Sequence, residues 1–463
     1  MAKTPISKDK LFGTDGIRGT PGVYPLTDGM LFKIGSGIGH YVSSISPTRR
    51  TKKLKVLIGK DTRLSGEQLE SILADSLKEQ GIDVSLVGII TTPGLSFLTA
   101  DLKADVGIMI SASHNKATDN GIKFFNAKGF KFSPEEENQI EDIIFNTLMR
   151  DVDKENLLGL GKITKTRNAQ PKYVKFLAST LEGSDLSGLR IALDCAFGAA
   201  CPFGKKLFQD LGAEVHSIHD TPHGHNINVG GAINPDFLKA LVLKEKADIG
   251  IAVDGDGDRG ILVDEKGNIL DGDFTIAIMA KYLLEKNRLP KNTLVTTVMC
   301  NYGLRAFLQE IGAEIHLTDV GDKHVLEALL KNNLNLGGEQ SGHIIFLDYL
   351  STPDGLLTAL QVLKVMKDTD CSLSELSKCI TKYPQILVNI KVKEKVPFEK
   401  MPSVTKKLQQ GNEQLKDKGR ILLRYSGTED LARVMVEGKD KNAIHRIAHS
   451  IAREIRQEIG IDE

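Results

Sequence analysis

Three segments of this chain repeat one pattern, in which a β-branched run, a loop and a helical stretch precede a second β-branched run that begins at a glycine. The three segments span residues 55–88, 191–219 and 294–319. Short β-branched runs that alternate with helical patterns are typical of βαβ units with parallel strands. The repeat therefore predicts three α/β domains of the same kind.

After another helical stretch, each repeat continues into a short apolar run that ends in a polar, glycine-bearing loop. These loops begin at Ser111, Asp254 and Glu339. Ligands of open α/β sheets bind beyond the carboxyl ends of the parallel strands. We therefore expect the three loops to face a shared crevice if the domains surround one.

The C-terminal part of the chain has a different pattern. Two strand-like runs, residues 419–429 and 431–439, precede one amphipathic helix over residues 442–459. This order indicates a smaller α+β domain, and we place the linker to it around residues 372–384.

Charge and hydropathy exclude several classes of partner. Lysine plus arginine equals aspartate plus glutamate at 60 residues each, so the net charge gives no reason to expect nucleic acid or an anionic membrane. No apolar stretch approaches the roughly 20 residues of a membrane span, and the N-terminus lacks the apolar core of a signal peptide. The five cysteines form no CxxC pair, so we expect free thiols in a cytoplasmic protein.

The run Asp254-Gly-Asp-Gly-Asp-Arg259 places three carboxylates directly after an apolar segment. Two such charges about 4 Å apart repel by about 4 kcal/mol at an effective dielectric constant near 20, and the glycines let the backbone turn so that the carboxylates converge. A divalent cation would relieve the repulsion. We therefore interpret Asp254, Asp256 and Asp258 as metal ligands rather than as a solvated acidic turn.

The same run partly matches a calcium-binding EF-hand, with Glu265 in the twelfth position. The sixth position holds Arg259 where an EF-hand needs glycine, and the flanking segments have strand patterns. A site with few carboxylates, completed by a phosphate, suits Mg²⁺ better than Ca²⁺.

Ser113, in the loop Ser111-Ala-Ser-His-Asn115, is the candidate nucleophile. A serine at a strand end is usually a turn residue, and a nucleophilic serine needs activation and a site that neutralises phosphate charge. His114 is adjacent, and Lys123 follows in the next apolar run, where it can also be an ordinary surface lysine.

Two later loops carry groups that bind sugars and phosphates. Gly338-Glu-Gln-Ser-Gly-His343 suits hydrogen bonding to sugar hydroxyls, with a histidine able to move a proton near neutral pH. Arg424-Tyr-Ser-Gly-Thr428 follows an apolar strand and can cradle a phosphate. The early run Phe12-Gly-Thr-Asp-Gly-Ile-Arg-Gly19 is glycine-rich with one arginine, and its simplest interpretation is a tight turn. No GxxxxGK[ST] motif occurs, which argues against a kinase.

Together these five motifs resemble those of the α-D-phosphohexomutase superfamily, in the family's order from residue 12 to residue 428. The resemblance implies an α/β fold: three similar α/β domains with mixed, largely parallel sheets, plus a smaller C-terminal α+β domain around a central cleft. The domains expected to carry the phosphoserine, the metal loop, the sugar-binding loop and the phosphate-binding loop are residues 1–157, 158–258, 259–379 and 380–463.

The resemblance also implies roles for individual residues. Ser113 matches the family's phosphorylated serine, whose phosphate completes the metal site of Asp254, Asp256 and Asp258. The residues that match positions stabilising charge or moving protons are Arg18, Lys123, Arg259 and His343. The residues that match the sugar-binding loop are Glu339 and Ser341, and those that match the loop holding the non-reacting phosphate are Arg424, Ser426, Gly427 and Thr428.

By this resemblance the chain is an isomerase, an intramolecular phosphotransferase that works through a phosphoserine and a bisphosphate intermediate. One Mg²⁺ per chain and a priming hexose 1,6-bisphosphate are implied, in a monomer or homodimer whose partner is a hexosamine phosphate. Phe12-Gly-Thr-Asp-Gly16 and Gln340 favour glucosamine phosphate, for amino-sugar and cell-wall precursor synthesis. The alternatives are glucose or mannose phosphate as substrate, a non-catalytic phosphosugar-binding protein, and a metal-dependent phosphatase.

The chain departs from the usual family pattern at four places. Lys116 stands where the family normally has proline, and Phe197 stands where it has asparagine. Lys323-His324 replaces the commoner Arg-Tyr, and Asp430 replaces a proline. None of these changes removes a proposed catalytic group.

Overall fold

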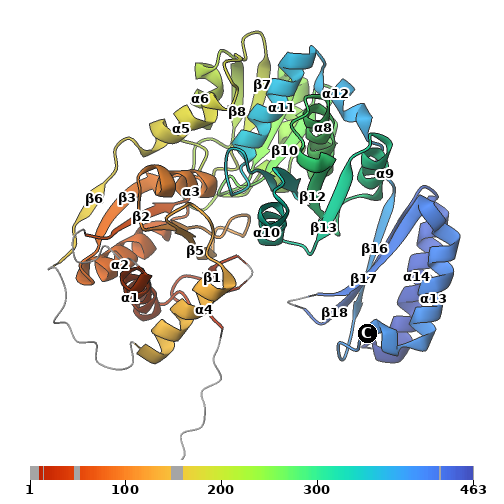
Figure 1. Ribbon diagram of the computed structural model, residues 1–463, viewed down its shortest axis with the longest axis horizontal. Helices are drawn as coiled ribbons and strands as arrows, with labels where there is room; N and C mark the ends of the chain where they lie inside the picture. Colours follow the sequence, from red (N-terminus) through yellow and green to blue (C-terminus); the bar gives the residue numbers. More distant parts are fainter. Residues whose placement is uncertain (1–9, 14, 46–52, 148–159, 427–428, 462–463) are drawn as a thin grey trace, which may run out of the picture. The chain divides into compact units, whose positions relative to one another are not determined.

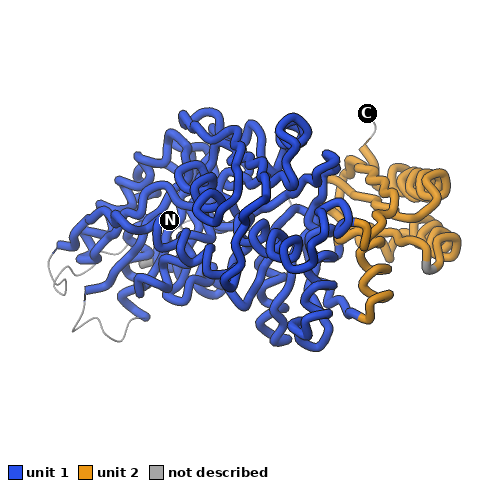
Figure 2. The backbone as a smooth tube through the Cα atoms, turned by 90° about the horizontal axis from the view of Figure 1, so that it is seen from above, with its two compact units in different colours: residues 1–298, 313–377 blue, residues 299–312, 378–463 orange. Residues whose placement is uncertain are grey.

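The computed structural model describes residues 10–13, 15–45, 53–147, 160–426 and 429–461. The chain divides into two compact units, which Figure 2 distinguishes by colour. Residues 1–298 and 313–377 form unit 1, and residues 299–312 and 378–463 form unit 2.

Unit 1 contains three sheets that share one strand order (Figure 1). In the first, β3 (Asp83–Ile89), β2 (Lys55–Lys60) and β4 (Val106–Ile110) are parallel and β5 (Asn120–Asn126) is antiparallel. In the second, the corresponding strands are β8 (Glu214–Ile218), β7 (Arg190–Asp194), β9 (Ile249–Val253) and β10 (Gly260–Asp264). In the third, they are β13 (Glu314–Thr318), β12 (Thr293–Thr297), β14 (Leu336–Gly338) and β15 (Ile344–Phe346). The predicted threefold repeat and its mixed, largely parallel sheets are confirmed.

Short strands extend two of these sheets. In the first sheet, β1 (Ile17–Gly19) pairs with β5 and β6 (Ile163–Lys165) pairs with β3. In the second sheet, β11 (Ile269–Leu270) pairs with β10.

Helices connect the parallel strands in each repeat. The first connections are α2 (Gly66–Glu79), α6 (Gly204–Asp210) and α9 (Tyr302–Glu310), and the second connections are α3 (Thr92–Asp101), α7 (Asp236–Glu245) and α10 (Asp322–Asn332). The glycines that follow the first connecting helices, Gly81, Gly212 and Gly312, have φ of +78°, +97° and +74°. A glycine in this left-handed conformation is the common way to end a helix, because it has no Cβ to clash.

The remaining helices of unit 1 are α1 (Asp28–Ile45), α4 (Pro134–Asp142), α5 (Ala169–Ser179), α8 (Gly272–Glu285), α11 (Gly355–Thr369) and the short α12 (Leu373–Leu376). Apolar residues of α1 and α2 at helical spacing, such as Ile34, Ile38, Leu69 and Leu73, pack on alternate residues of the first sheet. Burial of this kind is what holds an amphipathic helix on a sheet.

The same connection in each repeat carries one of the polar loops. Residues 111–119 join β4 to β5, residues 254–259 join β9 to β10, and residues 339–343 join β14 to β15. Each loop therefore leaves the carboxyl end of a parallel strand and returns as an antiparallel one. This topology supplies three equivalent places for ligand-binding groups.

Unit 2 has one antiparallel sheet of β16 (Gln385–Lys391), β18 (Leu431–Gly438) and β17 (Gly419–Tyr425). The helices α13 (Pro402–Leu415) and α14 (Lys441–Ile459) accompany it, and α9 belongs to this unit. The two strands and the helix predicted for the C-terminal part are confirmed, whereas β16 and α13 were not predicted. In the part of the chain that the structure describes, no helix is long and apolar enough to cross a lipid bilayer.

A buried hydrogen bond between α5 and the start of α11 supports one of the polar loops. The hydroxyl of Tyr173 donates to the carboxylate of Asp354, and both side chains are fully buried. Asp354 caps α11, whose first amide, that of Gly355, donates to the carbonyl of Gly257 at 3.0 Å. Burial raises the pKa of Asp354 to about 6 although Tyr173 and two backbone amides donate to it.

Tyr173→Phe is expected to lower the free energy of unfolding by about 1.5–3 kcal/mol, because it leaves a buried carboxylate oxygen without its donor. Calorimetric melting of the variant checks the prediction. The matched control is Tyr383→Phe, because phenylalanine keeps the ring contacts of Tyr383 with Tyr302 and Lys439. Equal melting temperatures for the two variants would contradict it.

Candidate active site

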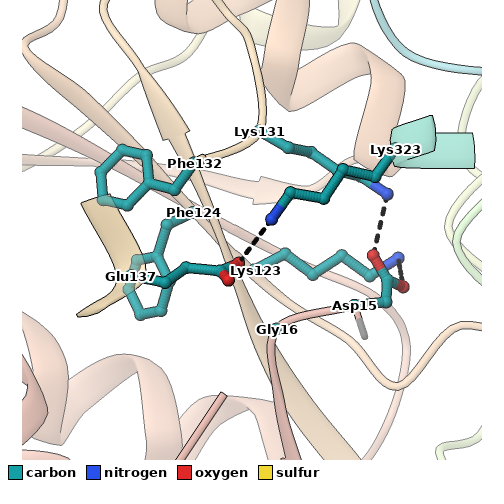
Figure 3. Close-up of a pocket in the computed structure, with 8 residues that line it drawn as sticks. All are labelled: Asp15, Gly16, Lys123, Phe124, Lys131, Phe132, Glu137 and Lys323. Carbon is teal, nitrogen blue, oxygen red and sulfur yellow. Dashed lines mark hydrogen bonds and ion pairs between the residues drawn. The ribbon is translucent and has the colours of Figure 1, made fainter. Parts of the chain in front are cut away.

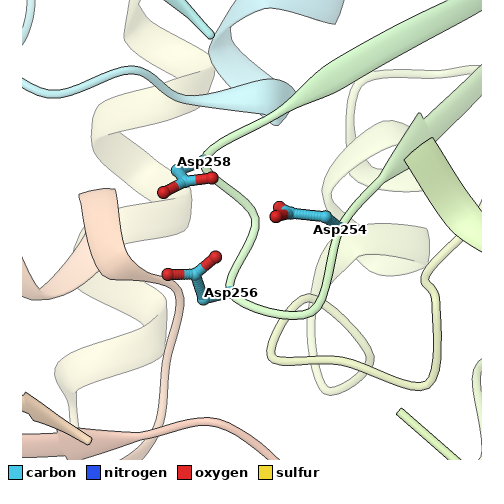
Figure 4. A group of neighbouring side chains, drawn as sticks. All are labelled: Asp254, Asp256 and Asp258. Carbon is cyan, nitrogen blue, oxygen red and sulfur yellow. The ribbon is translucent and has the colours of Figure 1, made fainter. Parts of the chain in front are cut away.

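The three aspartates of the second loop bring their carboxylates together in the protein interior. One carboxylate oxygen from each of Asp254, Asp256 and Asp258 lies within 4.8 Å of the others, and all three residues are buried (Figure 4). Gly257 has φ of +73° and a Cβ there would lie 2.5 Å from Thr91, so the turn requires glycine.

This cluster fits a divalent cation. Burial together with the neighbouring carboxylates of Asp258 and Asp256 raises the pKa of Asp254 to about 8. The Oδ1 atom of Asp256 is buried and has no hydrogen-bond partner among the described residues. Buried polar atoms nearly always have a hydrogen-bond partner, so the unpartnered carboxylate oxygen of Asp256 is suited to bind a cation. Oxygen ligands suit hard cations such as Mg²⁺, Ca²⁺ and Mn²⁺.

Glu265, the twelfth position of the EF-hand comparison, lies outside this cluster. Its carboxylate accepts hydrogen bonds from the amide and hydroxyl of Ser374. The loop is flanked by β9 and β10. This arrangement differs from an EF-hand, in which the twelfth residue is a ligand and the flanks are helices.

Lys123, on β5, provides a buried positive charge opposite the aspartates. Its ammonium lies 2.9 Å from a carboxylate oxygen of Asp15, 2.9 Å from one of Asp256 and 3.3 Å from one of Asp258. Burial alone would lower the pKa of Lys123, but these three carboxylates hold it well above its usual value. The structure thus makes Lys123 a permanent ammonium at neutral pH and not a surface lysine.

A second ion-pair group continues from Asp15 to the third domain. Lys131 lies 2.8 Å from Asp15 and 2.7 Å from Asp322, and Lys323 lies 3.3 Å from Glu137. Figure 3 shows Lys131 directed at Asp15 and Lys323 directed at Glu137. Lys323, one of the departures from the family pattern, therefore joins the first and third domains.

Ser113 is almost completely buried beside the aspartate cluster. Its hydroxyl donates to Asp254 Oδ2 at 3.0 Å and lies 3.4 Å from His114 Nδ1. The residue has φ of +51°, in the left-handed region that is uncommon for residues other than glycine. A residue keeps this unfavourable backbone conformation only where contacts with the surrounding structure enforce it.

Two residues of the β2–α2 loop, Asp61 and Arg63, hold the backbone of this serine loop, and neither belongs to a motif predicted from the sequence. The buried guanidinium of Arg63 is paired with Asp61 at 2.9 Å and donates to the carbonyls of Ser113 and Asn115, each at 2.9 Å. Asp61 also accepts from Ser111, whose hydroxyl in turn accepts from the Ser113 amide. Both residues follow the first strand of the first repeat, whereas the other polar loops follow the third strand; both locations are at the carboxyl end of a parallel strand.

His343 of the third loop contacts the metal loop through its imidazole. Nδ1 lies 3.0 Å from Glu339 and Nε2 lies 3.1 Å from Asp258. Burial alone would lower the pKa of His343, but the carboxylate of Asp258 and the hydrogen bonds to Asp258 and Glu339 raise it to about 10. The same Nε2 also lies 3.1 Å from Arg259 Nε, so the ring faces charges of both signs.

Two arginines flank Ser113. Arg18 donates to Asp15 at 2.6 Å and to Asn115 at 3.2 Å, and Arg259 Nη2 lies 3.0 Å from His114 Nδ1. Partial burial and the charges of Arg259 and Arg18 lower the pKa of His114 to about 4, so this ring is neutral. The two guanidiniums place positive charge around the serine.

Of the two residues predicted for sugar binding, one is buried and one is exposed. Glu339 accepts a hydrogen bond from the Gly321 amide at 2.8 Å in addition to its contact with His343. Ser341 is exposed on the loop. Glu339 therefore ties the third loop to the segment before α10.

The predicted phosphate loop lies in unit 2 at the end of β17. Arg424 is directly opposite Arg433 in the β17–β18 pair, and burial together with the charge of Arg433 lowers the pKa of Arg424. The buried Ser426 accepts from Arg433 at 3.4 Å and from Lys395 at 2.9 Å. Like charges directly opposite destabilise a sheet, and the charge of Arg433 is paired with the carboxylate of Glu429 at 2.9 Å. Gly427 and Thr428 lie outside the described residues.

Arg433 and Lys395 were not predicted from the sequence. Arg433 lies in the strand that follows the Arg424 motif, and its basic side chain is the signal that could have marked it. That it faces Arg424 depends on the pairing register of β17 and β18, which the intervening turn sets.

Four family models match the chain. Those of the phosphoglucomutase/phosphomannomutase alpha/beta/alpha domains I, II and III match residues 9–151, 171–267 and 271–383, and that of the C-terminal domain matches residues 387–454.

Curated relatives are similar over nearly the whole chain. The phosphoglucosamine mutase of Geobacter sp. (strain M21) is 46% identical over 456 residues, 97% of this chain and 98% of the relative. The phosphoglucosamine mutase of Chlamydia muridarum is 44% identical over 452 residues, 97% of each chain.

Solved structures share the fold. A phosphoglucomutase/phosphomannomutase family protein from Burkholderia thailandensis has a TM-score of 0.78 at 24% identity, covering 98% of this chain and 100% of that chain. The Aspergillus fumigatus N-acetylphosphoglucosamine mutase in complex with GlcNAc-6P and magnesium has a TM-score of 0.66 at 17% identity, covering 98% of this chain and 97% of that chain.

Proposed function

The chain belongs to the phosphoglucomutase/phosphomannomutase family, and we propose that it is a phosphoglucosamine mutase, an isomerase that interconverts glucosamine 6-phosphate and glucosamine 1-phosphate. The relatives with this name are 44–46% identical to the chain over nearly its full length. The reaction would supply amino-sugar and cell-wall precursor synthesis.

The observation that carries the chemistry is the contact between Ser113 and the aspartate cluster. A buried serine hydroxyl lies 3.0 Å from Asp254. Lys123 pairs with the neighbouring Asp256, and Arg18 and Arg259 contact Asn115 and His114 of the serine loop. A phosphoryl group on this hydroxyl would lie among cations and beside a metal-binding loop. Positioning and charge neutralisation supply most of the catalysis of phosphoryl transfer.

In the proposed cycle, phosphorylated Ser113 donates its phosphoryl group to the free hydroxyl of the sugar monophosphate. The bond from Ser113 Oγ to phosphorus breaks as a bond from the sugar oxygen to phosphorus forms. The proton of the sugar hydroxyl passes to a base in the site, and Ser113 Oγ takes up a proton; the second transfer reverses both movements. The product is a bisphosphate, which turns over in the site. Its other phosphoryl group then returns to Ser113 and leaves the isomeric monophosphate. A hexose 1,6-bisphosphate would prime the serine at the outset.

The charged side chains have distinct parts in this cycle. Arg18, Lys123 and Arg259 would neutralise the oxygens of the transferring group, because all three carry fixed positive charge next to Ser113. The ring of His343 contacts Asp258 and Glu339 and can carry a proton to or from a reacting oxygen. Asp254, Asp256 and Asp258 would hold Mg²⁺, which when bound supplies further positive charge for the phosphoryl oxygens.

A bisphosphate also needs a second phosphate site. We assign this role to Arg424 and Ser426 with Gly427 and Thr428, assisted by Arg433. Arginine's planar fork matches phosphate oxygens, and an anion would relieve the repulsion between Arg424 and Arg433.

The test is a coupled assay of glucosamine 6-phosphate conversion, with Mg²⁺ and a trace of glucose 1,6-bisphosphate, beside glucose and mannose phosphates. We expect kcat/KM to be highest for the glucosamine phosphate, because this ratio measures discrimination between substrates. A preference for another sugar would overturn the proposed substrate. Release of inorganic phosphate at every turnover would indicate a phosphatase instead.

Addition of Mg²⁺ is expected to stabilise the protein. An ion bound only by the folded state, at a hundredfold excess over its dissociation constant, raises the free energy of unfolding by about 2.7 kcal/mol. Melting in EDTA and then in MgCl₂ checks this, with NaCl of equal ionic strength as the control. Equal melting temperatures in MgCl₂ and NaCl would contradict a cation at the aspartate cluster.

A further inference from the structure

Asn228 is the residue whose side chain binds both the serine loop and the metal loop. Its Nδ2 donates to the carbonyl oxygens of Ser113 at 2.8 Å and Asn115 at 3.0 Å. Its Oδ1 accepts from the amide of Gly255 at 2.8 Å. All three contacts use the amide in one orientation, with its two N–H groups facing two carbonyls and its oxygen facing an N–H group. Asn228 therefore joins the first domain to the second at the nucleophile.

The local backbone is arranged to present this side chain. Asn228 has φ of +65°, a conformation that asparagine and glycine accept more readily than other residues, and its own amide donates to the Ala196 carbonyl at 2.8 Å. A Cβ at Gly255 would lie 2.9 Å from both Asn228 Nδ2 and the Ser113 carbonyl. Gly255 thus allows the two loops to approach closely enough for one amide to bridge them.

We propose that Asn228 is a positioning residue that sets the distance between Ser113 and the metal-binding aspartates, and this inference rests on the proposed mutase function. Arg63 holds the same two carbonyls from inside the first domain, so it fixes the shape of the serine loop but not its place relative to the second domain. Asn228 constrains the backbone of the loop from the second domain, beside the side-chain contacts of Arg259 with His114 and of Ser113 with Asp254. Misplacement of a reacting group by about 1 Å can cost on the order of a hundredfold in rate.

Other contacts between the same two domains survive without Asn228. The hydroxyl of Thr62 donates to the Phe197 carbonyl at 2.6 Å, and the amide of Thr92 donates to the Asp256 carbonyl at 2.8 Å. The ion pair of Lys123 with Asp256 also crosses between the domains. Removal of the Asn228 side chain is therefore expected to leave the two domains folded and joined, while the serine loop becomes free to shift relative to the aspartate loop.

The test uses Asn228→Gly in the full chain, because glycine adopts this φ without strain and lacks both ends of the amide. We expect kcat for glucosamine 6-phosphate to fall about tenfold to a hundredfold with KM changed less than about twofold, since the proposed sugar and phosphate loops are untouched. Asn228→Asp tests the two ends of the amide separately. It keeps the oxygen that accepts from the Gly255 amide, but it replaces the donor to the carbonyls of Ser113 and Asn115 with an oxygen. It should lose at least as much activity. The matched control is Asn234→Gly, an exposed asparagine in the same connection.

A second readout does not depend on turnover. Mn²⁺ binding is titrated on each variant with Ser113 unmodified and after phosphorylation by glucose 1,6-bisphosphate, with the modification followed by intact mass. In the wild type we expect phosphorylation to tighten Mn²⁺ binding, because the added phosphate lies beside the aspartates. Asn228→Gly should reduce that tightening at least about threefold, whereas Asn234→Gly should keep it.

These outcomes decide the inference. Equal kcat and equal tightening in the two glycine variants, or full activity in Asn228→Asp, would overturn the role of Asn228. A wild type that accepts the phosphoryl group but isomerises no sugar phosphate would overturn the proposed function alone, and the Mn²⁺ titrations would still decide whether Asn228 couples the two loops.

Discussion

Ser113→Ala is expected to abolish mutase turnover, with a loss on the order of 10⁴-fold or more, because no other side chain takes the place of a covalent phosphoryl carrier. The hydroxyl donates to the buried Asp254 at 3.0 Å and lies 3.4 Å from His114 Nδ1, so the variant should lose about 1–3 kcal/mol of stability and remain folded. The measurement is the coupled assay together with intact mass after incubation with glucose 1,6-bisphosphate. The variant should gain no phosphoryl group.

Thr118→Ala is the matched control for this prediction, since Thr118 is an exposed hydroxyl residue of the same loop. It should keep wild-type turnover and become phosphorylated normally. Substantial turnover in Ser113→Ala would end the phosphoserine mechanism. Phosphorylation of that variant would place the phosphoryl group on another residue.

Lys123→Met is expected to have the largest effect on stability. Lys123 is 2% exposed and faces three carboxylates within 3.3 Å, so its loss leaves buried negative charges without their cation. Removing one partner of a buried ion pair typically lowers the free energy of unfolding by about 3–5 kcal/mol. Mutase turnover should also be lost, because the same ammonium is proposed to neutralise the transferring group. Calorimetric melting in EDTA, compared with the wild type, measures the effect on stability.

Mg²⁺ should restore part of the stability that this variant loses. A bound cation supplies positive charge to Asp256 and Asp258, so the rise in melting temperature on adding MgCl₂ should be larger for Lys123→Met than for the wild type. Lys128→Met is the control, because Lys128 is an exposed lysine in the turn after the same strand. If Lys123→Met melts in EDTA at the same temperature as Lys128→Met, the buried carboxylates do not need the charge of Lys123 for the stability of the fold.

Much of the fold was predictable because its signals are local. The glycines at the ends of α2, α6 and α9 mark the same helix-to-strand turn in all three repeats, and each has the positive φ that makes glycine the favoured residue. Strand β16 and helix α13 were not predicted. The helix α13 is polar over most of its length and buries Val404, Gly411 and Leu415. Such a helix depends on the sheet beneath it more than on its own sequence.

The aspartate loop could be predicted as a group because its three carboxylates are neighbours in the chain. The environment of Lys123 could not, since its partners Asp256 and Asp258 are more than 130 residues away. A lysine in an apolar strand is compatible with an exposed edge or with a buried charge. Only the burial of the strand decides between them.

The repeated α/β pattern can be read from the sequence alone, as can the polar loops that follow the third strand of each repeat and the residue types in those loops. These features depend on the period of apolar residues and on turn chemistry, which act between neighbours along the chain. The tertiary structure alone decided which loops meet. Asn228 reaches Ser113, and His343 reaches Asp258, across more than 80 residues in each case. Contacts of that kind follow from the packing of whole domains, so no local pattern in the sequence records them.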